Sequence, residues 1–124
     1  MTSRLANICI DAVDPPLLAR FWCSVLGWHV AEEFDAGITI APVDAAWPVI
    51  DIVRVDDAKR HKNRVHLDLR ADGVGTDEEL ERLRGLGAVS VDVGQSAEVT
   101  WVVLADPEGN EFCLLATPVQ DLDS

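Results

Sequence analysis

One structural unit occurs twice in this chain of 124 residues. Each copy contains a short apolar strand, an acidic turn, an amphipathic helix and a closing glycine. The first copy runs from Asn7 to Gly27 and the second from His66 to Gly87, so Asn7 and His66 precede the closing glycine by 20 and 21 residues. Three further apolar runs follow each copy, separated by residues typical of turns. A duplicated unit indicates a site shared between the copies.

The first copy predicts a βαβββ module over about residues 4–56. Its helix follows Asp14-Pro15-Pro16, which places an acidic N-cap before a proline at the first helical position. Apolar residues then recur at steps of three and four until Gly27. The predicted strands are Leu5–Ile10, Trp28–Glu33, Ile38–Val43 and Val49–Val55.

The second copy predicts the same module over about residues 64–117. Thr76 and Glu79 have the spacing of a capping box before a helix. The predicted strands are Val65–Leu69, Ala88–Val93, Thr100–Leu104 and Glu111–Leu115. Only residues 56–63 separate the modules, so we expect a single domain over residues 1–124, of the α+β class with two small mixed sheets.

The bulk properties exclude several classes of partner. A net charge of -12 argues against binding to nucleic acid, which requires lysine and arginine to neutralise phosphates, and against anionic membrane surfaces. No stretch resembles a signal peptide or approaches the roughly 20 apolar residues of a membrane span. The three cysteines, an odd number without a CxxC pair, do not suggest a disulfide framework. We therefore expect a cytoplasmic protein that contacts neither nucleic acid nor membrane.

Three passages carry a family resemblance: DPPLLARFWCSVLG at residues 14–27, NRVHLDL at 63–69 and WVVLADPEGNEFCLL at 101–115. With the duplicated order of elements, they resemble the vicinal oxygen chelate superfamily of glyoxalases, bleomycin-resistance proteins and extradiol dioxygenases, and in particular its small glyoxalase-like domain proteins. The resemblance implies two tandem βαβββ modules whose curled mixed sheets surround a cavity. It also implies a homodimer.

Catalytic members of that superfamily hold a divalent metal with side chains from the first and last strand of each module. The first-strand positions are Asn7 and His66. For the last strands, Cys113 lies 26 residues after Gly87, and the same count from Gly27 reaches Val53. Only His66 is an ordinary ligand for a hard or borderline cation, so we predict no catalytic metal and keep a divalent metal as an alternative.

Several of these residues also have purely structural interpretations. His66 is either a hydrogen-bonded core histidine or a functional group of the cavity, and Cys113 is either a small buried hydrophobe or a metal-binding thiolate. Asp51 and Glu111 share the expected cavity face by strand alternation. If these two carboxyl groups converge, one of them can have a raised pKa and act as a general base.

Aromatic and basic residues add candidates for the cavity wall. Trp47, in a proline-flanked loop, and Trp101, at the start of a strand, are either core residues or a flat wall for an aromatic ligand. Four basic residues, Lys59, Arg60, Lys62 and Arg64, cluster before the second module. We interpret this run as a solvated loop, although it can also face an anionic ligand.

Three functions remain open from the sequence. The first is binding of a small organic molecule in the cavity between the modules without a metal, with ligand contacts from Asn7, Val53, His66, Cys113, Asp51, Glu111, Trp47 and Trp101; the acidic net charge favours a cationic ligand. The second is a glyoxalase-type lyase or isomerase with His66 as the catalytic residue, using either a metal with Glu111 or acid–base chemistry with Asp51 or Asp68. The third is an accessory module without a ligand.

Overall fold

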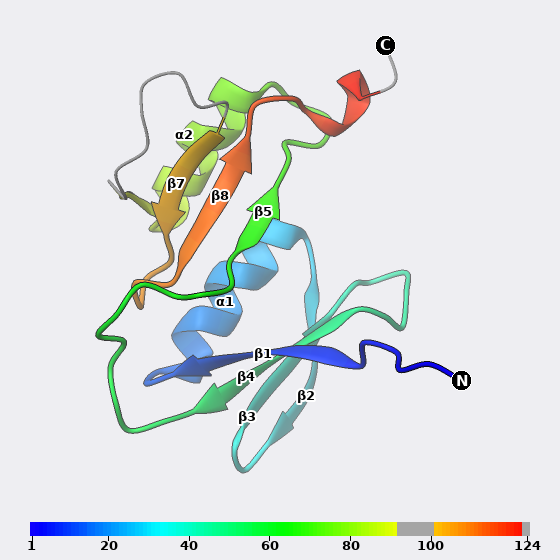
Figure 1. Ribbon diagram of the computed structural model, residues 1–124, viewed down its shortest axis with the longest axis vertical. Helices are drawn as coiled ribbons and strands as arrows, with labels where there is room; N and C mark the ends of the chain where they lie inside the picture. The colour runs from blue at the N-terminus through cyan, green and yellow to red at the C-terminus, as the bar shows by residue number, and fades with distance from the viewer. Residues whose placement is uncertain (92–100, 123–124) are drawn as a thin grey trace. The chain divides into compact units, whose positions relative to one another are not determined.

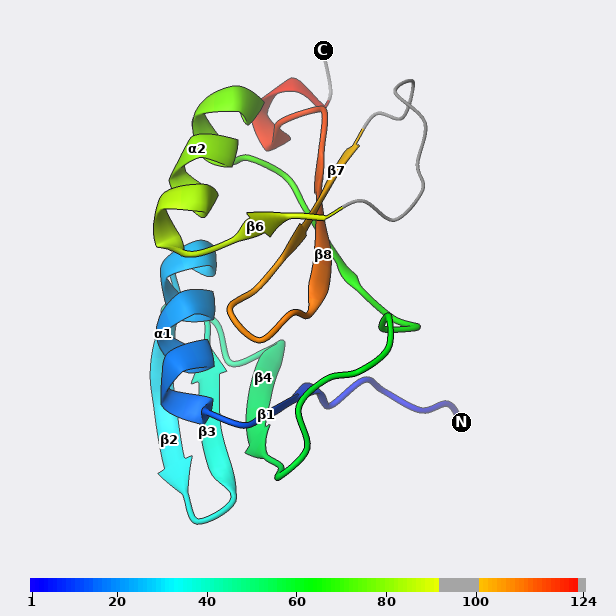
Figure 2. The same cartoon turned by 90° about the vertical axis from the view of Figure 1, so that its left-hand side faces the viewer.

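The computed structural model describes residues 1–91 and 101–122. The chain divides into two compact units, Met1–Ala58 and Lys59–Ser124, and each has the predicted βαβββ order of elements (Figures 1 and 2). The boundary falls inside the predicted connection of residues 56–63. Each unit carries a four-stranded mixed sheet, which confirms the predicted α+β class.

The sheet of the first unit has the strand order β1-β4-β3-β2. The parallel pair is β1 and β4, and the other neighbours are antiparallel, with β2 and β3 forming a hairpin. A parallel pair requires a long connection, which the helix and the hairpin provide. The strands are β1 Asn7–Ala12, β2 His29–Phe34, β3 Gly37–Ala41 and β4 Val49–Arg54.

Helix α1 (Pro15–Leu26) begins and ends as predicted. The carboxylate of Asp14 accepts a hydrogen bond from the Leu17 amide at 3.2 Å, and Pro15 occupies the first helical position, where a missing N–H costs nothing. Gly27 ends the helix in the left-handed conformation at φ 70°. The buried face of the helix, which includes Trp22, packs against β3 and β4.

The second unit repeats this topology with the strand order β5-β8-β7-β6, in which β5 and β8 are parallel (Figure 1). Its strands are β5 Leu67–Leu69, β6 Val89–Ser90, β7 Trp101–Ala105 and β8 Glu111–Leu115, followed by a 3-10 turn at Val119–Asp121. His66 directly precedes β5, so the first strand is shorter than predicted. Residues 92–93 and 100 of the two predicted strands lie outside the described residues.

Helix α2 (Thr76–Leu86) lacks the predicted capping box. Its N-cap is Gly75, whose carbonyl accepts from the Glu79 amide at 3.0 Å. The Thr76 hydroxyl donates to the carbonyl of Ala116 at 2.7 Å, and the Glu79 carboxylate binds Arg82. Both side chains therefore find partners outside the cap, which a local pattern cannot reveal.

Each sheet has one face that packs against its helix. In β4, Ile50 and Ile52 are buried, whereas the alternating Val49, Asp51 and Val53 are only partly buried. Since strand side chains alternate between faces, Asp51 lies on the face opposite α1. Cys113 and Glu111 have the corresponding place in β8, opposite the face that carries Phe112 and Leu114. These opposite faces carry the site residues.

Candidate functional site

A pocket of about 240 Å³ lies on the second unit. Its walls come from strands β5, β7 and β8 and from the segment that precedes β5. The lining residues are Lys62, His66, Asp68, Trp101, Val103, Glu111, Cys113 and Leu115. A wider depression of about 440 Å³ between α1 and β2 contains none of the predicted site residues. The pocket of the second unit is therefore the candidate site.

Three side chains with metal-binding atoms meet in this pocket. Asp68 pairs with Cys113 in the parallel ladder of β5 and β8, and His66 lies two residues before Asp68. The Nε2 atom of His66 is 3.1 Å from Oδ1 of Asp68. One imidazole nitrogen, one carboxylate oxygen and the thiol sulfur all lie within 4.8 Å of one another. The sequence pattern identified His66 and Cys113 but gave Asp68 only a secondary role.

The Cys113 thiol is held in its protonated form. Burial raises its pKa, and the negative charge and hydrogen bond of Asp68 raise it further, while the positive charge of Lys62 acts in the opposite direction. A thiol with a raised pKa is a poor nucleophile, because the thiolate is the reactive species. In the metal-free protein, Cys113 therefore acts as a hydrogen-bonding group and not as a nucleophile.

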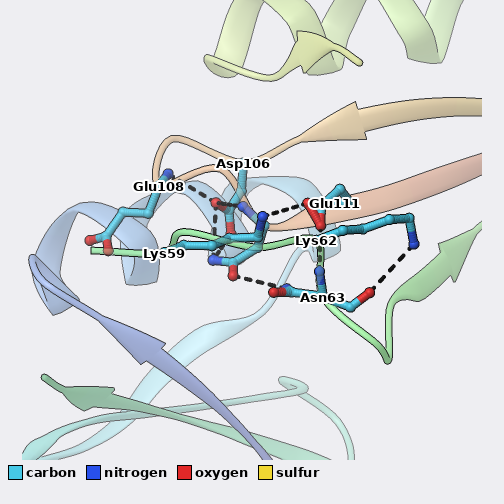
Figure 3. A network of polar contacts seen from close by, with 7 residues as sticks. Lys59, Lys62, Asn63, Asp106, Glu108 and Glu111 are labelled. Carbon is cyan, nitrogen blue, oxygen red and sulfur yellow. Dashed lines mark hydrogen bonds and ion pairs between the residues drawn. The ribbon is translucent and has the colours of Figure 1, made fainter. Parts of the chain in front are cut away.

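Glu111 is a buried carboxylate with two strong partners (Figure 3). The Lys59 ammonium lies 2.7 Å from Oε2, and the Asn63 amide donates to Oε1 at 2.8 Å. Burial by itself would raise the pKa of Glu111, but the hydrogen bonds from Lys59 and Asn63 and the charge of Lys59 outweigh it and lower the pKa. Glu111 is therefore ionised, and the suggestion that it has the raised pKa of a general base is wrong for this residue.

The Asp-Pro-Glu-Gly-Asn turn before β8 holds the segment that carries Lys59 and Lys62 (Figure 3). Within the turn, Asp106 accepts from the amides of Glu108 and Asn110 at 2.9 and 3.0 Å. The Asn110 side chain in turn accepts from Asn63 Nδ2 at 3.1 Å. The turn thus positions one wall of the pocket in addition to joining β7 and β8. The basic run, which we interpreted as solvated, supplies both the partner of Glu111 and a lining residue.

Asp51 is the centre of a smaller polar cluster on the first unit. It accepts hydrogen bonds from Asn7 Nδ2 at 2.8 Å and from the Thr39 hydroxyl at 2.5 Å. The Asn7 amide also lies 3.2 Å from the sulfur of Cys9. The structure thus brings together two of the predicted residues, Asn7 and Asp51. Thr39 was missed, although its position opposite Asp51 in a predicted hairpin was the available signal.

The strand pairing corrects the predicted register between the two modules. In the first unit Cys9 pairs with Asp51, and in the second Asp68 pairs with Cys113. Cys9 and Asp68 each lie two residues after the matching first-strand positions. Asp51 is therefore the counterpart of Cys113, and the predicted equivalence of Val53 with Cys113 is wrong.

Unequal loop lengths caused this error. Cys113 lies 26 residues after Gly87, whereas its counterpart Asp51 lies only 24 residues after Gly27. Val53 pairs with Gly37 and is partly buried. A residue count from the end of the helix to the last strand gives equivalent positions in the two modules only when the intervening connections have equal lengths.

The two candidate tryptophans have different surroundings. Trp101 lines the pocket with 40% of its surface exposed. Trp47 is 50% exposed, and its indole N–H donates to the carbonyl of Leu5 at 2.7 Å. Trp47 lines neither of the two pockets described above. Of the two, the structure places only Trp101 beside His66 and Cys113.

A family model for the glyoxalase-like domain matches residues 7–115. The chain belongs to the glyoxalase-like domain family. This membership confirms the resemblance on which the sequence interpretation rested. No curated protein matches the chain.

Solved structures share the glyoxalase fold at low sequence identity. The fosfomycin resistance protein FosX from Mesorhizobium loti has a TM-score of 0.70 and 15% identity, covering 97% of each chain. A glyoxalase/bleomycin resistance/dioxygenase family enzyme from Burkholderia phytofirmans PsJN has a TM-score of 0.62 and 19% identity, covering 90% of this chain and 97% of that one. A mutant of FosX from Listeria monocytogenes, complexed with Mn(II) and 1S,2S-dihydroxypropylphosphonic acid, has a TM-score of 0.69 and 15% identity, covering 98% of this chain and 97% of that one. At these identities the likeness shows the fold.

No helix within residues 1–91 and 101–122 is both long and apolar enough to cross a membrane.

Proposed function

We propose that this glyoxalase-like protein binds a small organic molecule in the pocket of its second unit. The observation that carries the proposal is the division of the pocket lining into an apolar and a polar part. Trp101, Val103 and Leu115 supply apolar surface, and His66, Asp68 and Cys113 supply polar groups. Small-molecule sites combine apolar walls with a few polar groups that orient the ligand. A volume of about 240 Å³ suits a small ligand.

Hydrogen bonding among the polar groups supports this proposal. Asp68 contacts His66 and also interacts with the thiol of Cys113, and Glu111 is held by Lys59 and Asn63. Side chains that are already oriented lose less conformational freedom when a ligand binds. A cavity shared between the two modules and a homodimer, both implied by the family resemblance, remain predictions. Sedimentation analysis tests the dimer.

A matched pair of tryptophan variants tests the proposal. Small aromatic and aliphatic compounds are screened by ¹H–¹⁵N NMR, in which each of the four tryptophans gives one indole signal. We expect ligands to shift the Trp101 signal. We expect the affinity, followed by the backbone amide signals that both variants retain, to fall about five-fold or more in Trp101→Ala, since truncating such an aromatic contact costs more than about 1 kcal/mol. Trp47→Ala, which removes an exposed indole outside the pocket, is expected to leave affinity unchanged.

Two outcomes of this experiment would contradict the proposal. If no compound shifts the Trp101 signal, the protein has no ligand at this pocket and the accessory role is favoured. If compounds bind but Trp101→Ala and Trp47→Ala weaken them equally, the pocket is not the binding site.

A second candidate function is a metal-dependent lyase or isomerase, and the cluster of His66, Asp68 and Cys113 favours it. The donor set of nitrogen, oxygen and sulfur fits Zn²⁺ or a similar borderline ion better than Mn²⁺, which prefers oxygen ligands. These three residues would hold the ion. A bound Zn²⁺ can polarise a carbonyl group or lower the pKa of a bound water. The Mn(II) complex of the FosX mutant supports a metal in a protein of this fold.

Metal analysis of the purified protein tests this candidate. Stoichiometric zinc that is lost in both His66→Ala and Cys113→Ala supports a metal-dependent enzyme. Cys23→Ala, which removes a thiol of helix α1 outside the cluster, is the control and is expected to retain the metal. A protein that takes up no zinc, nickel, cobalt or manganese after incubation with each ion refutes the candidate.

A further inference from the structure

We infer that the ligand of this pocket is a small organic anion, whose oxyanion binds Lys62 while its apolar body lies against Trp101. This inference rests on the proposed function and specifies the charge of the ligand. It reverses the expectation of a cationic ligand that the net charge of -12 suggests. Three features of the pocket support it: the state of its acids, the availability of Lys62 and the composition of the remaining wall.

The two carboxylates of the pocket already have partners. Glu111 is paired with Lys59 at 2.7 Å and accepts from the Asn63 amide at 2.8 Å. Asp68 lies 3.1 Å from His66 and interacts with the thiol of Cys113. A cationic ligand would have to compete with these contacts. Glu111, whose charge is already paired, is therefore a poor receptor for a positive charge, and the acceptor positions of Asp68 are partly occupied.

Lys62 is the residue of the pocket lining whose ammonium group can still bind a ligand. Its one hydrogen bond in the described parts of the chain, residues 1–91 and 101–122, is a long one of 3.4 Å from Nζ to the Asn63 carbonyl. No carboxylate in those ranges lies within ion-pair distance of Lys62. An ammonium group carries three donors, so Lys62 can donate hydrogen bonds to an oxyanion without giving up an existing ion pair. Its charge already reaches the pocket interior, because it acts on Cys113.

The net charge of -12 does not prevent an anion from binding at Lys62. Charges separated by more than about 8 Å are largely screened at physiological ionic strength. A ligand anion in the pocket therefore senses mainly the groups that line it. The acidic surface lowers the rate at which an anion approaches more than it lowers the strength of a direct contact with Lys62.

The remaining wall specifies the rest of the ligand. Trp101 offers an indole with 40% of its surface exposed, and Val103 and Leu115 extend the apolar surface. Flat apolar groups stack well on such a surface. The pocket therefore fits an aromatic or aliphatic acid of modest size.

Probes that share one aromatic body and differ in the charge of their polar end group test the inference. Phenylacetate, phenylacetamide and 2-phenylethylamine share one aromatic body, and the three 1-naphthyl analogues repeat the series with a larger one. Dissociation constants are measured from the Trp101 indole signal at low salt. We expect each acid to bind about two- to five-fold more tightly than its amide, the range for one exposed ion pair, and each amine to bind more weakly than its amide. Raising the ionic strength is expected to reduce the preference for the acid.

Two variants that each remove one positive charge provide the matched comparison. Lys62→Met is expected to abolish the preference for the acid while leaving the amide within about two-fold. Arg60→Met, which changes a nearby exposed residue outside the pocket lining, is expected to retain the preference. Equal binding of acid and amide, or a preference that survives Lys62→Met, overturns the inference and leaves the proposed pocket intact. If none of the six compounds shifts the Trp101 signal, the pocket and the inference fail together.

Discussion

Glu111 is the buried charge whose replacement tests the structure most directly. It is 8% exposed, and its partner Lys59 retains 21% of its side-chain surface. Glu111→Gln keeps an oxygen that can accept from the Asn63 amide and removes only the charge, so Lys59 loses its ion pair. Breaking a fully buried pair costs roughly 3–5 kcal/mol. Because Lys59 can still reach water, we expect a loss of about 1–2 kcal/mol in the free energy of unfolding at pH 7.

The pH dependence of this loss follows from the lowered pKa of Glu111. In the unfolded chain the carboxyl group has its ordinary pKa of 4.5, and folding lowers it. The stabilisation is therefore complete above about pH 4.5 and disappears as the pH falls through the folded-state pKa. The difference between the wild type and Glu111→Gln should be constant from pH 5 to 8 and shrink below pH 4.5.

Urea denaturation followed by tryptophan fluorescence measures this difference. Glu81→Gln is the matched control, because Glu81 is paired with Arg84 at 3.3 Å but is 76% exposed. We expect the control to cost less than about 0.5 kcal/mol. A cost for Glu111→Gln no larger than that of the control, or a difference that persists undiminished at pH 3, would refute the account of Glu111 as a buried, paired carboxylate.

Three further changes test other parts of the structure. Asp14→Ala removes the cap of α1 and should cost about 1 kcal/mol in urea denaturation, whereas Asp14→Ser should restore most of it. Gly37→Ala would drive a methyl group into the Ile52 carbonyl oxygen and should lower the melting temperature sharply, while Gly85→Ala, with nothing within 4 Å in α2, should leave it unchanged or raise it. Iodoacetamide at pH 8 should modify the exposed Cys9 much faster than Cys113, whose burial raises its pKa, as mass spectrometry of the peptides can show; equal rates would contradict the buried thiol.

Local sequence signals predicted the elements of the fold well. The Asp14-Pro15 start and the Gly27 stop of α1 are confirmed, because an N-cap side chain and a left-handed glycine act within a few residues. The predicted capping box of α2 is absent, because groups outside the cap bind its two side chains. Thr76 and Glu79 have the right spacing, but the carbonyl of Ala116 and the guanidinium of Arg82 bind them instead. Sequence spacing identifies which groups can pair, but it does not determine which of several competing partners each group binds.

The site residues also divide into those that the sequence predicted and those that it did not. The family resemblance, which assigns the first- and last-strand positions of the second module to His66 and Cys113, was sufficient to identify two residues that line one pocket. The role of Lys59 was not predictable, since its partner Glu111 is 52 residues away in the sequence and is brought near by the turn at Asp106. A basic residue in a connecting segment has the same local pattern whether it is solvated or buried against an acid.

The sequence by itself determined that the chain contains two copies of a βαβββ module, because the copies repeat their own order, helix ends and apolar periodicity. The tertiary structure alone decided the register between those copies. Strand pairing aligned Asp51 with Cys113, whereas residue counting had aligned Val53. Register depends on hydrogen bonds between distant strands, and loops of different length shift a residue count without disturbing those bonds. The repeat located the site, and the pairing of the strands determined which side chains form it.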